Sequence, residues 1–200
     1  MITRQEALQL IEEHVENKNI IKHMVALEAV MGALAEKFQI SNFKLQIDPA
    51  EWKMAGLLHD GDYNDSVPVE KQGIQITEWA RESLPAGRQG YEVPENVAHA
   101  MAAHNWHNTG VEPESKMDWS IFCADSLTGL IVACALVLPT KKLADVSVEM
   151  VQKKFGQKSF AAGTRRDEIA LCQEKLGISL GEFIKISLTA MQGIYQDIGL

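Results

Sequence analysis

The stretch "MAGLLHDGDYND", residues 54–65, is an apolar segment that ends in an imidazole and a group of carboxylates. Asp48 and Pro49 lie just before it, in the order of a capping side chain followed by a first-turn proline, which predicts a helix start. The helix that follows is apolar and brings His59 and Asp60 toward the protein interior. Because buried polar and charged groups are costly unless they are compensated, we expect a bound metal ion at this point.

Helix signals recur along the rest of the chain. Thr3 with Glu6 and Ser115 with Asp118 have the capping-box pattern. In this pattern the side chain of the first residue caps the helix, and the side chain of the second accepts a hydrogen bond from the backbone N–H of the first. The apolar spacing and the turn signals predict helices over 3–15, 20–38, 48–61, 70–84, 94–104 and 119–138, followed by two or three more. Only 44–48 has a weak strand pattern, and 85–94 is rich in glycine and proline, as exposed loops are.

The last sixty residues contain further helix start and end signals. Thr164 with Asp167 and Ser179 with Glu182 predict two further helix starts, and Gly177 predicts a helix end between them. We therefore expect an all-α fold. The expected organisation is a single domain over 1–200, with a core at about 20–137 and C-terminal helices from 140 to 200 packed on it.

Composition limits the function. The chain has 200 residues, a net charge of −8 and 46% apolar residues, which is the balance of a globular domain. The acidic net charge argues against a nucleic-acid duplex or an anionic membrane as partner, since either would need a basic face. The apolar segment 121–138 approaches the length of a membrane span, but Asp125 within it favours a buried core helix. Three cysteines without a CxxC pair and an N-terminus without a signal-peptide pattern predict buried thiols and a cytoplasmic location.

Two further residues interrupt apolar helix faces. His23 lies on the apolar stripe of the helix at 20–38, and Asp125 is the only charged residue between Asp118 and Lys141. A cation bound by His23, His59, Asp60 and Asp125 would compensate all of these groups together. Imidazole and carboxylate ligands suit a divalent transition metal ion (Mn, Fe, Co, Ni or Zn) better than calcium.

The order His23, His59-Asp60, Asp125 resembles the H…HD…D signature of the HD-domain superfamily of metal-dependent phosphohydrolases. The contexts "AGLLHDGDY" and "ADSLTGLIVA" look most like the small stand-alone bacterial members described as HDIG-type hydrolases. The resemblance covers about 20–137. It implies an all-helical fold and a metal ion (Mn, Fe, Co, Ni, Zn or Mg) held by these four residues. Gly61 and Asp62 stand where the HDIG pattern has isoleucine and glycine, so the chain departs from it there.

Several residues near this signature are secondary candidates. Some family members hold a second metal through histidines placed between the HD pair and the last aspartate, where this chain has His99, His104 and His107. His99 and His104 point about 140° apart on a helix, so the two would not bind one ion, and His104 at the helix end is the better candidate. Asp62 could orient the attacking water or simply turn the chain.

Two cationic residues could contact a phosphate. Lys22 precedes His23, and Arg165 belongs to the basic stretch 151–166 of an otherwise acidic chain. Both also fit an ordinary solvated surface. The sequence therefore predicts hydrolysis of a small phosphorylated compound such as a nucleotide, with Asp62 and His104 as catalytic residues and Lys22 and Arg165 at the substrate. The alternatives are a two-iron oxygenase of the same fold and a non-catalytic module with a structural metal, and the oligomeric state is open.

Overall fold

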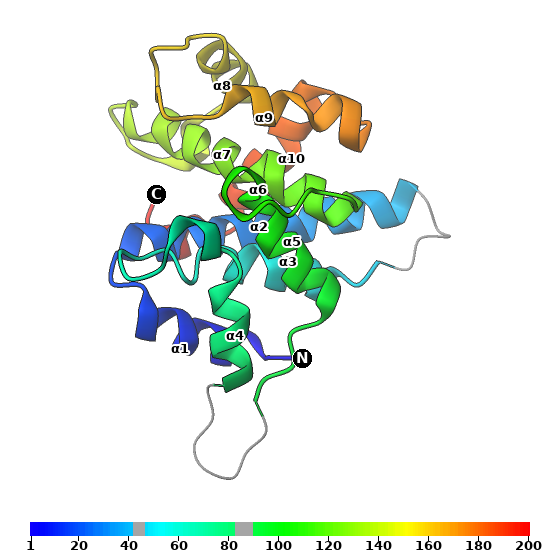
Figure 1. Cartoon of the computed structure of the whole chain (residues 1–200). Coiled ribbons are helices and arrows are strands. Elements are labelled where there is room, and N and C mark those ends of the chain that lie inside the picture. The colour runs from blue at the N-terminus through cyan, green and yellow to red at the C-terminus, as the bar shows by residue number, and fades with distance from the viewer. Residues whose placement is uncertain (42–46, 83–89) are drawn as a thin grey trace.

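The computed structural model describes residues 1–41, 47–82 and 90–200, and within these ranges every regular element is a helix (Figure 1). The predicted all-α fold is confirmed. In chain order the elements are α1 (Arg4–His14), α2 (Lys18–Ser41), α3 (Pro49–Leu58), the 3-10 turn η1 (Val69–Lys71), α4 (Gln75–Glu82), α5 (Glu95–His104), α6 (Trp106–Thr109), α7 (Lys116–Leu136), the 3-10 turn η2 (Leu143–Asp145), α8 (Val148–Phe155), α9 (Arg166–Ala170), the π-helical turn η3 (Cys172–Leu176), α10 (Leu180–Gln192) and α11 (Tyr195–Ile198).

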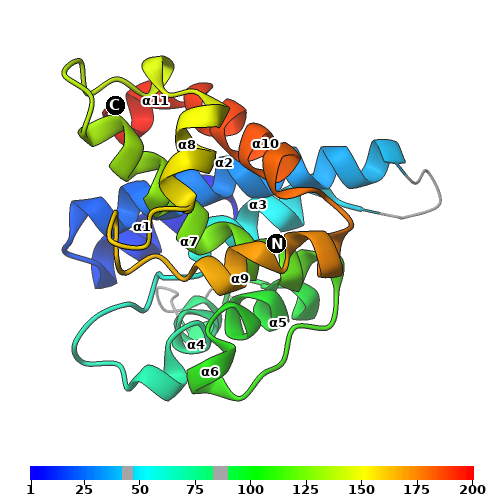
Figure 2. The ribbon, with the colours of Figure 1, turned by 90° about the horizontal axis from the view of Figure 1, so that it is seen from above.

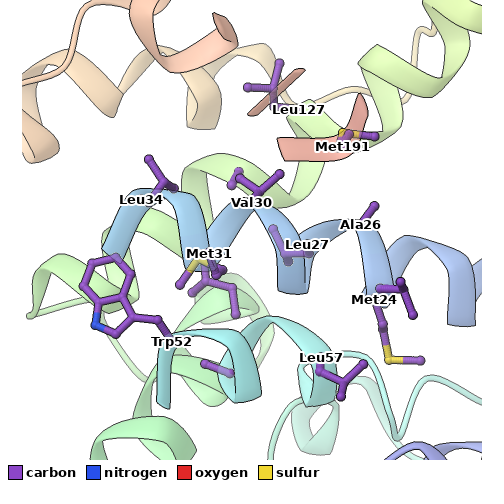
Figure 3. Packing of buried hydrophobic residues seen from close by; sticks show 14 of the residues in the cluster. Met24, Ala26, Leu27, Val30, Met31, Leu34, Trp52, Leu57, Leu127 and Met191 are labelled. Atoms are coloured by element: carbon purple, nitrogen blue, oxygen red, sulfur yellow. The ribbon is translucent and has the colours of Figure 1, made fainter. Parts of the chain in front are cut away.

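Two long helices, α2 and α7, form the centre of the molecule (Figures 1 and 2). Helix α2 packs on α3, α7 and α10, and α7 packs in turn on α5, α8 and α9. Figure 3 shows Met31 and Leu27 of α2 on the side of α3, while Val30 lies on the side of Leu127 and Met191. Apolar side chains of α2 are buried on several sides, so α2 positions α3 and α7. Helix α5, which carries His104, is positioned by α3 and α7 instead.

A glycine sets the distance between α2 and α3. A Cβ atom added to Gly56 would lie 2.7 Å from the carbonyl oxygen of Leu27 and 2.9 Å from the amide nitrogen of Glu28, both backbone atoms of α2. A larger residue would push the two helices apart, since backbone atoms cannot yield as a side chain does. The close approach places the end of α3, with His59, against the middle of α2.

Helix α7 is the apolar segment that raised the question of a membrane span. By length and composition alone it could cross a bilayer, and 61% of its most apolar window is buried against the other helices. Its start is the predicted capping box of Ser115 and Asp118, which is confirmed. In this structure α7 is packed as the core helix that the sequence predicts.

The helix starts at Thr3, Asp48 and Ser179 are confirmed, and Gly177 ends η3 with a left-handed conformation. The predicted cap at Thr164 is wrong, because α9 begins one residue later and Arg165 at its N-cap position makes no side-chain capping bond. The three cysteines are buried free thiols, as predicted: Cys123, Cys134 and Cys172.

The predicted helix over 70–84 is also wrong in part. The chain forms the short turn η1, breaks at Gly73, where φ is +91°, and begins α4 only at Gln75. The expected strand at 44–48 and the expected loop at 85–94 fall largely on residues 44–46 and 85–89, which lie outside the described ranges.

Candidate metal centre

Four helices bring five side chains that could bind a metal ion to one place. His23 comes from α2, His59 and Asp60 from the end of α3, His104 from the last position of α5 and Asp125 from the middle of α7. The four residues of the predicted signature and the secondary candidate His104 therefore meet, although they are spread over about half of the chain.

Their donor atoms converge at short range. The Nε2 atom of His23 lies 3.1 Å from Nε2 of His59 and 2.9 Å from Oδ1 of Asp125. Asp60 closes the group from the other side, with its Oδ2 atom 3.4 Å from His59 Nε2 and its Oδ1 atom 3.4 Å from His104 Nε2. The donors fall into two overlapping sets, His23–His59–Asp125 and His59–Asp60–His104, and within each set all donor atoms lie within 4.8 Å of one another.

Each imidazole is held by its other nitrogen. Nδ1 of His59 lies 2.9 Å from the carbonyl oxygen of Gly56, and Nδ1 of His104 contacts the carbonyl oxygen of Met101. Since a carbonyl oxygen only accepts hydrogen bonds, we assign the proton to Nδ1 in both rings. In the neutral form of each ring, Nε2 then carries the lone pair that is directed at the centre, which is the arrangement of metal-binding histidines in proteins.

His23 is held in the same way by a threonine. Its Nδ1 atom lies 3.0 Å from the hydroxyl oxygen of Thr128, and that hydroxyl group lies 2.8 Å from the carbonyl oxygen of Asp125, to which it donates. The hydroxyl oxygen must then accept the proton of His23 Nδ1. Thr128 is almost completely buried and was not among the residues that the sequence singled out.

The charges of the centre also favour a cation. Burial by itself would raise the pKa of Asp60, but neighbouring His59 and His104 hold that pKa well below its usual range. Burial likewise opposes the charged form of His104, yet the carboxylate of Asp60 raises the pKa of His104 to about 9. For Asp125, the bond to His23 outweighs burial and lowers the pKa.

The donor set fits a divalent metal ion. Two carboxylates and three neutral imidazoles carry two negative charges, which a divalent cation neutralises. When His23 and His59 are neutral and protonated on Nδ1, their Nε2 atoms are two hydrogen-bond acceptors only 3.1 Å apart. A positive charge must therefore lie between or beside these two atoms. A proton supplies that charge in a metal-free chain, and a metal ion would supply it in a loaded one.

The other predicted catalytic residue, Asp62, has a different setting. It is fully buried, and its carboxylate accepts hydrogen bonds from the backbone N–H groups of Gly73 and Ile76 at 2.8 to 3.0 Å. A Cβ atom on Gly73 would lie 2.5 Å from the carbonyl oxygen of Met101 and 3.1 Å from the His104 ring. Asp62 therefore holds the backbone of Gly73 close to the His104 ring. Its predicted role at a water molecule stays a prediction.

The two other candidate histidines, His99 and His107, lie away from the cluster. Nδ1 of His99 is 3.0 Å from the carboxylate of Asp118 at the start of α7, as the rotation of α5 between His99 and His104 requires. His107 is largely exposed, and its Nε2 atom lies 3.3 Å from the buried carboxylate of Glu168.

The two predicted substrate contacts lie near the centre but do not touch it. Arg165 pairs with Glu168 at 3.2 Å, and its backbone N–H donates to Ser126, the neighbour of Asp125. Lys22 is exposed and lines a cavity that His23 also lines. Both cations thus border the region of the cluster, and their contact with a phosphate stays a prediction.

The cluster is reachable from solvent on one side. The side chains of His23 and Asp125 are 22% and 24% exposed, whereas that of His59 is completely buried. A cavity of about 350 Å³ is lined by His23 and Asp125 together with residues 161–164. A ligand could therefore approach the centre from the side of α7.

No family model, no curated protein and no solved structure matches this chain.

Proposed function

We propose that this chain is a metal-dependent phosphohydrolase that cleaves a phosphate ester of a small molecule, such as a nucleotide. One observation carries the metal part: three imidazole Nε2 atoms and two carboxylates converge, and every imidazole is oriented by an acceptor at Nδ1. The phosphate part rests on the resemblance of His23, His59-Asp60 and Asp125 to the HD signature.

In this proposal His23, His59, Asp60 and Asp125 hold the ion. When bound, the ion supplies a water of lowered pKa and a Lewis acid for the phosphoryl oxygen. His23 and Asp125 present the open side of the centre, which supports a catalytic rather than a purely structural metal, since structural sites are closed by protein ligands.

His104 is the proposed catalytic residue beside the metal ligands. It lies beside Asp60, at the end of α5, and its raised pKa favours a positive charge there in the metal-free chain. We assign it to the phosphoryl group, whose negative charge it would stabilise, or to a second ion. Asp62 acts through Gly73, which it holds against the His104 ring. The substrate contacts of Lys22 and Arg165, the absence of a nucleic-acid duplex or membrane partner and a cytoplasmic location belong to the same proposal.

The test is phosphate release from a panel of phosphate esters by the purified chain supplied in turn with Mn²⁺, Fe²⁺, Co²⁺, Ni²⁺, Zn²⁺ and Mg²⁺. We expect hydrolysis of at least one ester, and its loss in Asp60→Ala and His104→Ala. His99→Ala is the matched control, because it removes a histidine from the same helix that faces Asp118 instead. Equal activity in Asp60→Ala and the wild type would contradict the proposal, as would no hydrolysis of any ester with any metal.

One observation favours the two-iron oxygenase as a second candidate. The two oxygens of Asp60 face different imidazoles, with Oδ1 toward His104 and Oδ2 toward His59 and His23. A carboxylate placed in this way can bridge two ions. Two equivalents of iron per chain, with oxygen consumption and no ester hydrolysis, would favour this candidate over the phosphohydrolase.

A further inference from the structure

Helix α7 is buried along most of its length but has one open stripe that begins at the candidate metal centre. Asp125 is half-buried, Gly129 is exposed, Val132 is half-buried and Leu136 is 51% exposed. Residues at spacings of three and four share one face of a helix, so these four form a continuous line. Beyond the aspartate the line is apolar, and it leads outward from the centre.

Gly129 is an unusual residue for this place. Glycine is among the least favourable residues in the interior of a helix. A Cβ atom added there would have nothing within 4 Å, so neither helix packing nor a close backbone approach calls for glycine. Its backbone is helical, and it is absent from the positive-φ glycines of the described residues. What glycine does provide is free space one turn from Asp125.

Two cavities meet at this space, and both are lined by His23 and Gly129. The first, of about 350 Å³, also contains Asp125 and the segment 161–164. The second, of about 340 Å³, extends along Val132 and Leu136 to Ile198. Each reaches the lower end of the volume range of small-molecule sites.

The outer wall of the first cavity is held in place. The segment 156–165 leads into α9 (Figure 2). The guanidinium group of Arg166 donates to six carbonyl oxygens between 154 and 164. Ala161 within this wall has a φ of +44°, a left-handed conformation that is uncommon for alanine. The fixed arginine donors stabilise the bent segment next to His23 and Asp125.

We propose that the groove over Gly129 binds the organic group of the phosphate ester, and that Gly129 determines which esters fit. The inference rests on the proposed function, because it places the phosphoryl group at His23 and Asp125. The organic group then lies over Gly129 against the apolar side chains of Val132 and Leu136. Within the proposed class of phosphate esters, the groove favours a monoester with a compact, largely apolar group, such as an aromatic ring, next to the phosphate, over a nucleotide, whose phosphate is joined to a polar sugar.

Charge supports this occupant over an uncharged apolar one. The rim of the second cavity carries Lys22, which makes no ion pair within the part of the chain that the structure describes. In a chain of net charge −8, an unpaired ammonium beside an apolar groove and a metal centre suits a ligand that joins an apolar group to an anion.

Two phosphonates that cannot be hydrolysed test the inference by calorimetry on the full chain loaded with Mn²⁺. Phenylphosphonate carries an aromatic ring, and methylphosphonate carries only a methyl group on the same anion. We expect the wild type to bind phenylphosphonate more tightly. Gly129→Leu fills the groove and should weaken phenylphosphonate binding by about tenfold or more, while methylphosphonate changes by less than about twofold. The affinity of Gly129→Ala for phenylphosphonate should lie between those of the wild type and Gly129→Leu.

Gln39→Leu is the control, since it adds the same side chain to an exposed position of α2 about 24 Å along the helix from His23. Circular dichroism should show Gly129→Leu folded, because the substitution raises helix propensity at an exposed site. If neither phosphonate binds the wild type, the proposed function and this inference fall together. If methylphosphonate binds and Gly129→Leu affects both ligands equally or neither, the inference alone is wrong. A wild-type dimer that Gly129→Leu dissociates would also overturn it, since the stripe would then be a subunit interface.

Discussion

Thr128 provides the sharpest test of how the centre is built. Its hydroxyl group accepts the Nδ1 proton of His23 at 3.0 Å and donates to the Asp125 carbonyl oxygen at 2.8 Å, and the residue is 1% exposed. The substitution Thr128→Val keeps the shape and removes the acceptor. In a metal-bound chain the Nδ1 proton of His23 then has no partner, because Nε2 is committed to the ion.

The size of the effect follows from this geometry. A buried donor without a partner costs about 1–3 kcal/mol. The metal-free chain escapes that cost, because His23 can move its proton to Nε2 and donate to Asp125 Oδ1, 2.9 Å away. The penalty therefore appears in metal binding, and we expect an affinity about 10- to 100-fold lower, the range in which outer hydrogen-bond partners act.

Competition of the purified chain with a chromophoric chelator for Co²⁺ or Zn²⁺ measures this affinity. Thr128→Ser is the matched control, since it keeps the hydroxyl group and should bind the metal within a few-fold of the wild type. Urea denaturation of the metal-free Thr128→Val chain should show a much smaller change than the metal affinity does. Metal binding by Thr128→Val as tight as that of the wild type would refute the assignment of His23 as a ligand through Nε2.

Three further predictions concern the frame around the centre. Gly56→Ala should destabilise the fold by about 1–3 kcal/mol in urea denaturation, because the new Cβ atom would overlap the backbone of α2; unchanged stability would show that the two helices can separate freely. Burial outweighs Arg165 and raises the pKa of Glu168, so its ionisation costs stability as the pH rises above the usual 4.5. The free energy of unfolding of Glu168→Gln, relative to that of the wild type, should therefore increase from about pH 4.5 upward and then level off. A relative stability of the variant that decreases over this pH range would contradict the prediction. A thiol reagent should label the folded chain slowly and the unfolded chain fully, since all three cysteines are buried and their thiol pKa values are raised; fast labelling of one thiol in the folded chain would contradict that burial.

The parts of the fold and site that sequence predicted share one property: their signals are local or strongly periodic. Capping boxes and the apolar stripe of α2 depend on neighbouring residues, and a polar residue within an apolar stripe must lie in the interior. For this reason the convergence of His23, His59 and Asp125 could be anticipated from three separate helices. Helix rotation showed that His99 and His104 would not bind one ion, and the position of His104 at the helix end favoured it over His99.

The missed features depend on contacts between distant segments. Thr128 reads as an ordinary helix residue until α2 brings His23 beside it. The break at Gly73 reflects two distant partners, the carboxylate of Asp62 and the carbonyl oxygen of Met101, and neither is visible in the pattern of 70–84. The predicted cap at Thr164 is wrong because α9 begins one residue later, after a turn whose carbonyl oxygens bind the Arg166 side chain, and the local pattern does not reveal that turn.

The most direct test of the metal centre is the metal content of the full chain, purified without a metal-affinity tag and measured by elemental analysis. Asp60→Ala removes the carboxylate whose two oxygens face His59 and His104, and His99→Ala serves as the control outside the cluster. We expect at least one equivalent of Mn, Fe, Co, Ni or Zn in the wild type and in His99→Ala, and loss of that metal in Asp60→Ala. A wild-type chain without metal, even after reconstitution with each of these ions, or an Asp60→Ala chain that keeps its full metal content, would contradict the account.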